Sequence, residues 1–397
     1  MASTTEKLQE LSRCDSIYPR TVELRRTFHR YPELAFEEVR TAETIMMELQ
    51  HLDIPYEYGG KGTGVVGRLS RGGRDAPTVA LRAEMDALPG IESTGLPFTS
   101  VVQGKMHACG HDAHMAMVLG AAALLRECPP NGNVLFVFQP AEERGGGSRV
   151  VIRSGVFRGA HAIFAGHVTN HYRVGEIMIA SGVITAQSDR FAIKVQGRGG
   201  HGARPHEAVD AVVVSGMLIA AIQTLVSREI DPVHPSVVTI GRVQAGTAPN
   251  VIAEEAVLEG TIRTTHVQTR KHIHHGLTRM AKALGELHNA QVNITITEGY
   301  PPVVNTQREA GLAGRAARAV VGGAGLVTMD HPSMGSEDFS YYLHEMPGCF
   351  VRFGCRGGEQ GYIPLHSPAF DIDEEVLRVG AAFFDELARV ALSEYAR

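Results

Sequence analysis

The sequence predicts an α/β fold in which a mixed, mostly parallel sheet is interrupted by an inserted ferredoxin-like α+β unit. Two observations support this. Short apolar segments at 78–85, 134–138 and 162–165 alternate with a helical pattern at 112–127, as in sheets of parallel strands. From about residue 188 the order becomes strand, helix, strand, strand, helix, strand, which is that of a ferredoxin-like unit.

In the first part of the chain, residues 21–52 have a helical pattern that Pro32 interrupts. Each of the three apolar strands that follow runs directly into His, Asp or Glu residues. Ligands of parallel α/β sheets bind beyond the carboxyl ends of the strands. We therefore expect the functional site at these three strand ends.

The sequence from residue 188 to residue 299 predicts a compact insertion. Its expected elements are a strand at 190–196, a helix at 207–229, strands at 236–243 and 256–263, a helix at 267–288 and a strand at 291–298. Gly-Tyr-Pro-Pro at 299–302 is typical of an exit linker, and α/β character resumes as far as Phe384. We expect one domain from 1–187 with 300–397, and an inserted domain at 188–299.

Composition excludes several functional classes. The 397 residues carry a formal net charge of −5, which argues against a nucleic-acid surface. No run of 18 or more apolar residues is present, so no membrane span is expected. The first residues are polar where a secretory signal needs an apolar core. The five cysteines are irregularly spaced, which favours a reducing compartment, and we expect a cytoplasmic protein.

The segment 106–114, Met-His-Ala-Cys-Gly-His-Asp-Ala-His, is the strongest chemical signal. Cys109 and His111 lie two residues apart in a glycine-containing turn before a helix, where a thiolate and an imidazole can point at one centre. A single histidine is more often a core or surface residue. This density of metal-binding side chains is difficult to explain by packing and indicates a metal site.

Adjacent carboxylates follow the second strand, in Gln-Pro-Ala-Glu-Glu at 139–143. They could belong to a solvated loop. Alternatively, because neighbouring loop side chains diverge, one of Glu142 and Glu143 could bind a metal while the other acts as general base. Glu84 and Asp86 are better placed to orient ligands. His167 and His366 add two imidazoles further along the chain.

These motifs resemble a known family. In order, RAEMDALP, MHACGHDAH, FQPAEE, GH, GRGGHGARPH, APNVIAEEA, GTIR, GSEDF and LH are similar to the aminoacylase and carboxypeptidase-G2-type metallohydrolases, in particular the hippurate hydrolase and auxin-conjugate hydrolase branch. The resemblance covers nearly the whole chain, from His29 to His366. It implies a di-metal peptidase-like catalytic domain with an inserted lid and dimerisation domain.

The resemblance implies a ligand set for two divalent ions. Cys109 matches a ligand that bridges both metals. One site would be completed by Glu143 and His366, and the other by His111 and His167. Cysteine and histidine suit Zn²⁺, although Mn²⁺, Co²⁺ or Ni²⁺ are also possible.

The resemblance also implies roles for residues that bind no metal. Glu142 matches the general base and Asp86 an aspartate behind the ligands. His201 matches a histidine that reaches the active site of a neighbouring subunit, which implies a homodimer or higher oligomer. Asn250 and Arg263 match residues that hold the substrate carboxylate or the oxyanion.

The expected function is therefore hydrolysis of N-acyl amino acids to a carboxylic acid and an amino acid. Three alternatives remain open: a dipeptidase, carboxypeptidase or aminobenzoyl-glutamate hydrolase with the same site, a hydrolytic deaminase of an aryl amine, and a noncatalytic metal-binding protein. The presence of Glu142 argues against the last, because a binding protein needs no base.

The sequence departs from the family pattern at three places. Glu84 replaces a commoner Asp, His171 and Tyr172 replace a short apolar, Pro-containing stretch, and Asn-Val-Ile-Ala replaces Asn-Val-Ile-Pro. The second change could reshape the substrate pocket. Two other signals are weak. Residues 197–202 match a G-x-G-x-x-G pattern, but Pro205 interrupts the turn and the preceding strand does not begin a βαβ unit of the right kind, which argues against a dinucleotide site. The histidines at 272–275 fit a solvated helix face.

Overall fold

The computed structural model describes residues 4–58, 63–73, 75–358 and 361–397. The chain forms two compact units. The large unit contains the chain up to Ile184, Val304–His331 and Asp338–Arg397, and the inserted unit contains Thr185–Val303 and Pro332–Glu337. The expected insertion at 188–299 did not include Pro332–Glu337. This segment belongs there because the Ala186 N–H donates to the Ser333 carbonyl at 2.7 Å, a pairing between distant residues.

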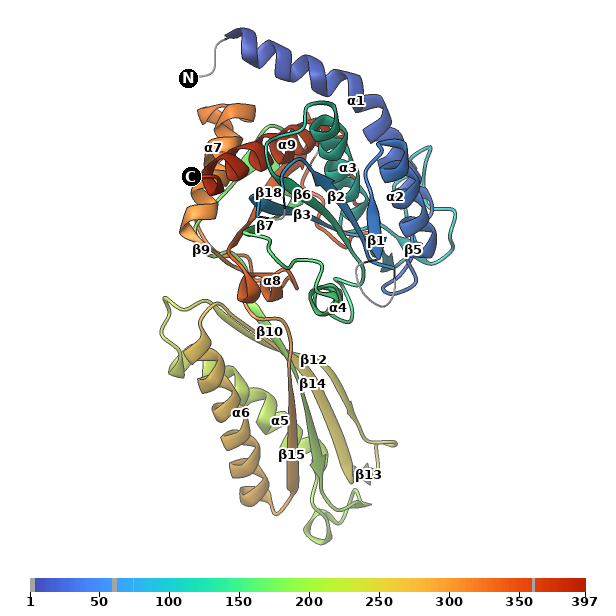
Figure 1. Cartoon of the computed structure of the whole chain (residues 1–397). Coiled ribbons are helices and arrows are strands. Elements are labelled where there is room, and N and C mark those ends of the chain that lie inside the picture. The colour runs from blue at the N-terminus through green and yellow to red at the C-terminus, as the bar shows by residue number, and fades with distance from the viewer. Residues whose placement is uncertain (1–3, 59–62, 74, 359–360) are drawn as a thin grey trace. The chain divides into compact units, whose positions relative to one another are not determined.

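The large unit is built on a mixed eight-stranded sheet in the order β1-β2-β6-β3-β7-β18-β8-β17 (Figure 1). Its strands are β1 Tyr56–Tyr58, β2 Val65–Ser70, β3 Thr78–Glu84, β6 Asn133–Gln139, β7 Ala162–Arg173, β8 Ile177–Met178, β17 Leu326–Val327 and β18 Gly348–Arg356. The four central strands β6, β3, β7 and β18 pair in parallel, whereas β1, β2 and β8 add antiparallel pairs. The predicted mixed, mostly parallel sheet therefore forms the centre of this unit.

Helices cover this sheet. They are α1 Thr4–Arg30, α2 Val39–His51, α3 His111–Glu127, α4 Gly147–Ser154, α7 Gln307–Val321, α8 Ser340–Glu345 and α9 Glu375–Tyr395. The chain does break near Pro32, between α1 and α2, but α1 begins at Thr4 rather than at the predicted residue 21. Helix α1 continues through Pro19.

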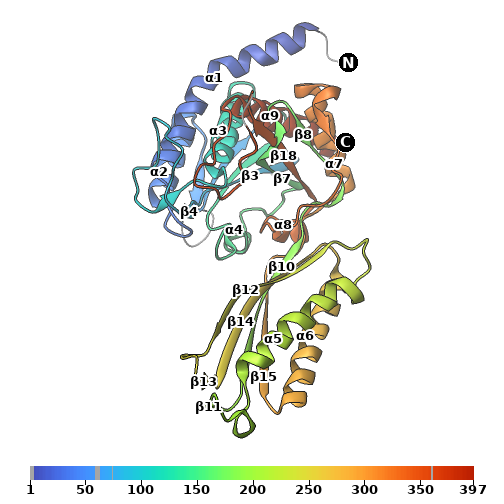
Figure 2. The same cartoon turned by 180° about the vertical axis from the view of Figure 1, so that it is seen from behind.

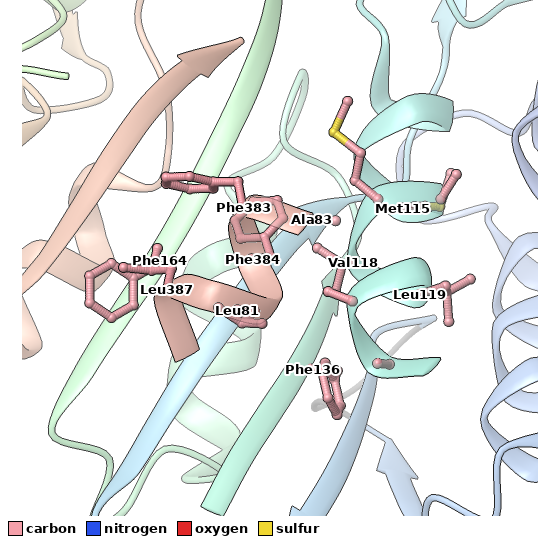
Figure 3. Close-up of a cluster of buried hydrophobic side chains, with 14 of the residues drawn as sticks. Leu81, Ala83, Met115, Val118, Leu119, Phe136, Phe164, Phe383, Phe384 and Leu387 are labelled. Atoms are coloured by element: carbon pink, nitrogen blue, oxygen red, sulfur yellow. The ribbon is translucent and has the colours of Figure 1, made fainter. Parts of the chain in front are cut away.

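The core of the large unit lies where α3 and α9 meet the sheet (Figure 3). Strands β3 and β6 are buried along their whole length, which is why their sequences are almost continuously apolar. Leu81 and Phe136 from these strands lie close to Val118 of α3 and Phe384 of α9 (Figure 3). Burying each such side chain contributes about 1.5–3 kcal/mol, and this packing fixes the strand ends that carry the site.

The inserted unit has a four-stranded antiparallel sheet in the order β12-β14-β10-β15. Its elements are β10 Gln187–Gln196, α5 Ala211–Thr224, the π turn Leu225–Glu229, β12 Ser236–Ala245, β14 Glu255–Thr264, α6 Val267–His288 and β15 Gln291–Glu298. Both helices lie on one face of the sheet (Figure 2). Burial alternates along β10, with Phe191 and Ile193 turned into the core.

Short elements complete the two units. They are β4 Leu88–Pro89, β5 Lys105–Met106, β9 Gly182–Val183, β11 Gly200–His201, the 3₁₀ turn Pro205–Glu207, β13 Val251–Ile252, β16 Val304–Asn305 and the 3₁₀ turn Gly323–Gly325.

One segment of the described chain, Ala211–Glu229, is long and apolar enough to cross a membrane by length and composition. No membrane span was expected here because polar residues such as Ser215 and Gln223 interrupt the apolar run. Val214, Leu218 and Ile222 on one side of this helix belong to the core of the inserted unit. Its apolar composition is therefore explained in part by packing against the sheet.

Candidate metal centre

The predicted site residues of the large unit gather at the carboxyl ends of its central strands. Asp86 lies just beyond β3, Glu142 and Glu143 lie just beyond β6, and His167 is in β7. These strands are neighbours in the sheet, so their loops converge. This is the edge at which the sequence predicted a functional site.

The turn before α3 requires Gly110. Its φ is +88°, a left-handed conformation that side chains disfavour. A Cβ atom at this position would also lie 2.3 Å from Cγ2 of Val168. The glycine thus lets the chain pass close to β7 and places Cys109 and His111 on either side of the turn. The His366 N–H donates to the Ala108 carbonyl at 2.8 Å, which attaches the fifth predicted ligand to the same segment.

The five predicted ligands form two overlapping groups. The ligand atoms of Cys109, His111 and His167 lie within 4.8 Å of one another, and so do those of Cys109, Glu143 and His366. The Cys109 sulfur is 3.3 Å from Nε2 of His167, and Nε2 of His366 is 3.2 Å from Glu143. Cys109 belongs to both groups, as a bridging ligand must.

The hydrogen bonds of the histidines leave the correct nitrogens available for metal binding. His111 uses Nδ1 to contact the Asp86 carbonyl at 2.8 Å, and His167 uses Nδ1 to contact the Val168 carbonyl at 2.7 Å. Nε2 of His111 is buried and makes no hydrogen bond in the described chain. A buried ring nitrogen without a partner is costly, and a metal ion would satisfy it.

His114 differs from these ligands although it belongs to the same motif. Its Nδ1 contacts Glu84 at 2.9 Å, and its Nε2 accepts the Val168 N–H at 2.9 Å. Both ring nitrogens are therefore occupied. His114 supports the site without being available as a ligand.

The electrostatics of the predicted ligands also suit a cation. Burial, followed by the charges of Glu143 and Glu142, raises the pKa of the Cys109 thiol well above its usual value. Burial alone would lower the pKa of His111, but Asp86 and Glu84 raise it to about 10. A divalent ion would reverse both effects, because it binds the thiolate and the neutral imidazole. The donor set therefore fits metal ions.

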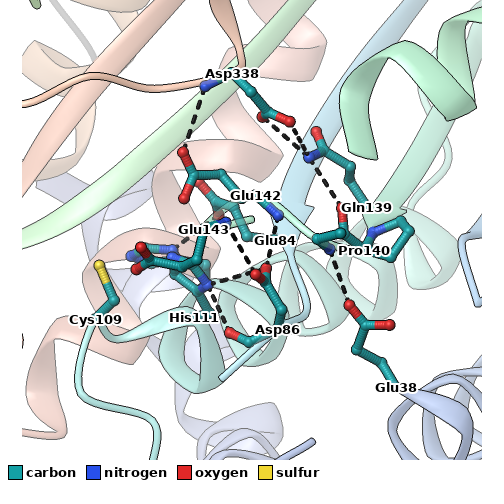
Figure 4. A network of polar contacts seen from close by, with 12 residues as sticks. Glu38, Glu84, Asp86, Cys109, His111, Gln139, Pro140, Glu142, Glu143 and Asp338 are labelled. Carbon is teal, nitrogen blue, oxygen red and sulfur yellow. Dashed lines mark hydrogen bonds and ion pairs between the residues drawn. The ribbon is translucent and has the colours of Figure 1, made fainter. Parts of the chain in front are cut away.

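Asp86 connects the predicted ligand His111 with the loop that carries Glu142 and Glu143 (Figure 4). Its carboxylate accepts the N–H groups of Glu142 and Glu143, each at 2.9 Å. Its own carbonyl receives the His111 hydrogen bond described above. Asp86 is thus hydrogen-bonded to three of the predicted site residues.

A buried ionic network lies behind the site and was not assigned from the sequence. Arg82 forms an ion pair with Glu84 and another with Asp338, the latter at 2.8 Å. Asp338 also accepts hydrogen bonds from Gln139 at 2.9 Å, and its N–H donates to Glu142 at 3.4 Å (Figure 4). Burial opposes ionisation of Glu84, but Arg82 and His114 hold its pKa well below the usual value. Asp338 was visible only as part of the motif GSEDF.

Glu38 is a second residue that the sequence did not reveal. Its carboxylate accepts the Ala141 N–H at 2.9 Å and the Thr63 hydroxyl at 2.6 Å. Ala141 has a left-handed φ of +54°, which a residue with a side chain adopts at a cost. Glu38 stabilises the loop in the conformation that aims Glu142 and Glu143, and no local sequence pattern indicates this.

The predicted residues of the inserted unit lie in two separate places. His201 is exposed on β11, and the adjacent Gly202 N–H donates to the Asn250 carbonyl at 2.8 Å, so His201 and Asn250 share one end of the unit. Arg263 is near the other end of β14, where it donates to the Ser336 hydroxyl at 2.7 Å. The intervening strand separates them by roughly 25 Å. Asn250 and Arg263 of one unit therefore cannot contact the same small ligand.

Comparison with known proteins gives consistent results. The model of peptidase family M20/M25/M40 matches residues 80–390. The chain is 38% identical to an N-acetylcysteine deacetylase of Bacillus subtilis over 95% of this chain and 98% of the relative. It is also 38% identical to IAA-amino acid hydrolase ILR1-like 4 of Arabidopsis thaliana over 99% of this chain and 90% of the relative.

A solved structure shows the same architecture. The Bacillus subtilis YXEP protein, described as a dinuclear metal-binding peptidase of the M20 family, superposes with a TM-score of 0.82 at 36% identity. The match covers 96% of this chain and 99% of that protein.

Proposed function

Because this chain belongs to peptidase family M20/M25/M40, and is thus a metal-dependent hydrolase of amide bonds, we propose that it removes the acyl group from N-acyl amino acids. The observation that carries the proposal is the pair of ligand groups that share Cys109 beside Glu142. The relatives named above support the substrate class, since one is named as a deacetylase of N-acetylcysteine and the other as a hydrolase of IAA-amino acids.

We assign the ligands as the sequence predicted. Cys109 is shared, Glu143 and His366 complete one site, and His111 and His167 complete the other. A thiolate with imidazoles favours Zn²⁺, although this donor set also accepts Mn²⁺, Co²⁺ or Ni²⁺. When bound, two such ions would lower the pKa of a water molecule and polarise the amide carbonyl.

Glu142 is the proposed general base. It is only 6% exposed, and the Asp338 N–H contacts its carboxylate, so its position is defined. The carboxylate accepts a proton from the attacking water and delivers it to the nitrogen of the leaving amino acid. Water is thereby added across the C–N bond: the acyl carbon gains the hydroxyl and the amine gains the proton.

The inserted unit is proposed to supply substrate contacts. The exposed His201 suits a role in the active site of a second copy, where its imidazole would donate to the developing oxyanion. Asn250 lies beside it and would act with it, whereas Arg263 would hold the substrate carboxylate. This arrangement requires at least a homodimer.

We also propose a reducing, cytoplasmic location. None of the five cysteines forms a disulfide in the described structure, although four of them are buried. Fractionation of cells that express the protein tests this, and recovery in an oxidising compartment with disulfides would contradict it.

Metal analysis and a substrate panel test the function. The protein should contain two divalent ions and hydrolyse N-acetyl or N-benzoyl amino acids, with loss of activity after chelation. Glu142→Gln should keep both ions and lower kcat by about 10²–10⁴-fold, the usual contribution of a general base. The neighbouring Glu143→Gln should instead lose metal. Full turnover by Glu142→Gln, or cleavage of dipeptides alone, would refute the proposal.

A further inference from the structure

The inserted sheet carries a row of polar side chains on the face opposite its helices. Thr239, Thr261, Arg190 and Thr297 lie directly across from one another on β12, β14, β10 and β15. In Figure 2 these four strands lie side by side with α5 and α6 on one side. Because residues alternate between the faces of a strand, this row faces away from the helices, while Phe191 next to it points into the core.

Arg190 is the only charged residue in this row. It is exposed and has no ion pair or hydrogen bond with any residue in the described part of the chain. The adjacent Arg242 differs, because it pairs with Glu259 at 2.9 Å. Arg190 is flanked instead by the hydroxyl groups of Thr261 and Thr297. A guanidinium group only donates hydrogen bonds and a threonine hydroxyl can donate one, so the three groups together suit an anionic acceptor.

A second guanidinium group lies next to this row. Arg263 is two residues beyond Thr261 on β14, which places it diagonally from Arg190 at a Cα separation of about 7–8 Å. It donates a hydrogen bond to the neutral Ser336 hydroxyl at 2.7 Å. Burial, and then the positive charge of Arg190, lowers the pKa of Arg263. The two guanidinium groups therefore repel each other. The charge of Asp189 opposes this effect on Arg263, but within the described residues neither arginine forms an ion pair with a carboxylate.

The surface around Arg190 is hollowed. An open hollow of about 520 Å³ is lined by Arg190, by the paired Arg242 and Glu259, and by four threonines, among them Thr295. Ala192 and Gly241 leave room on the strands beside Arg190. The volume suits a small molecule, and the donors that line it suit carboxylate oxygens.

We propose that Arg190 and Arg263 form a subsite for a ligand with two carboxylates, so that the preferred substrates are N-acyl derivatives of acidic amino acids. The proposal rests on the proposed function for the first carboxylate, which Arg263 holds. The second carboxylate, that of the amino-acid side chain, pairs with Arg190 and accepts hydrogen bonds from the flanking threonines. Neutral N-acyl amino acids leave Arg190 without a partner.

N-acetyl-L-glutamate and N-acetyl-L-glutamine test this, because they have nearly the same shape and differ by one charge. The wild-type kcat/KM should favour the glutamate compound by about tenfold or more, the usual effect of a hydrogen bond to a charged group. Arg190→Gln should remove this preference by lowering kcat/KM for N-acetyl-L-glutamate alone. Lys194→Gln is the control, since Lys194 is on the same face of β10 but already pairs with Glu255 at 2.6 Å.

Binding measurements separate this proposal from the proposed function. Glutarate and its monoamide can be titrated calorimetrically into the full-length, metal-loaded protein, with no turnover required. Arg190→Gln should weaken glutarate binding about tenfold and leave the monoamide unchanged. If no N-acyl amino acid is cleaved but this difference is observed, the function is wrong and the subsite stands. Equal glutarate binding by wild type and Arg190→Gln would overturn the subsite, as would an unaltered substrate preference.

Discussion

The two units place their reactive side chains in opposite environments. In the large unit three of the five predicted ligands are buried, with Cys109 7% exposed, His111 0% and His167 6%, whereas the His366 side chain is 54% exposed. In the inserted unit, His201 and Arg190 are on the surface, and the core beneath them is apolar. Folding and chemistry therefore depend on the same residues in the large unit and on different residues in the inserted unit. Substitutions should change stability and activity together in the first unit, and activity alone in the second.

The largest effect is expected from Cys109→Ser. Serine is a far weaker ligand than a thiolate, and Cys109 belongs to both ligand groups, so both ions and all activity should be lost. Because metal binding contributes to stability, the melting temperature should also fall. Metal content, activity and thermal unfolding measure the three effects on one sample.

Cys349→Ser is the matched control. Cys349 is also fully buried, but it lies in β18 outside both ligand groups. It should retain both ions and activity. If Cys109→Ser loses only one ion, Cys109 does not bind both ions.

Arg82→Met should have the next largest effect, on stability. It removes the cation between Glu84 and Asp338 and leaves two buried carboxylates uncompensated. Such a loss costs about 3–5 kcal/mol. The comparison variant is Arg242→Met in the inserted unit, where the pair with Glu259 is exposed and is worth about 0–1 kcal/mol. Urea unfolding of both variants measures the contrast, and equal losses would mean that burial does not distinguish the units.

Much of the fold was predictable because its signals are local. Helix α6 Val267–His288 and strand β15 Gln291–Glu298 have the bounds that periodicity predicted. Strand β7 does not, since the sequence suggested an end at residue 165 and the strand continues to Arg173. Its outer part is polar, and it pairs with β18, which is nearly two hundred residues away. Such long-range pairing cannot be predicted from the sequence of one segment.

The candidate site was likewise predictable where its signals are local and not where they depend on the fold. Cys109, His111, Glu142 and Glu143 were predicted as site residues because metal-binding and acidic residues are dense around them. This density alone does not separate His114 from the predicted ligands; only the family resemblance left it out, and in the fold its two hydrogen bonds distinguish it. Roles that depend on long-range contacts, such as that of Asp338, likewise required the fold.

His201→Ala tests whether an exposed residue of the inserted unit affects activity without affecting stability. Loss of an oxyanion donor should raise the activation barrier by about 2.7–4 kcal/mol. Because the side chain is exposed, the free energy of unfolding should change by less than about 0.5 kcal/mol. Activity and urea unfolding, measured together, show whether the two properties separate.

Mixed subunits show whose site His201 serves. Subunits with His201→Ala keep the metal ligands, and subunits with Glu142→Gln keep the histidine. After subunit exchange, a mixed dimer should regain one working site if His201 acts in the partner's site. Demonstrated exchange without recovered activity would place the histidine in the site of its own chain.

The smallest effect is expected from the pH dependence of a buried histidine in the large unit. His29 is 1% exposed and contacts Asp112 at 2.8 Å and Glu92 at 3.1 Å. Burial opposes its protonation, but these two carboxylates raise its pKa to about 9. The unfolded value is about 6.5, so the folded state holds the proton more tightly. The resulting stability is fully present below pH 6.5 and is lost as the pH rises through 9.

The free energy of unfolding should therefore fall by on the order of 1–3 kcal/mol between pH 6.5 and 9.5 because of this residue. His29→Gln should flatten the decrease, since glutamine can hydrogen bond but does not titrate. His272→Gln is the surface counterpart, because His272 is half exposed and pairs with Glu229 at 3.1 Å in the inserted unit, where solvent weakens the interaction. It should leave the profile unchanged. If the free energy of unfolding of His29→Gln falls with pH as steeply as that of the wild type, other groups cause the decrease. The buried pairs of His29 would then not determine how the stability of the protein depends on pH.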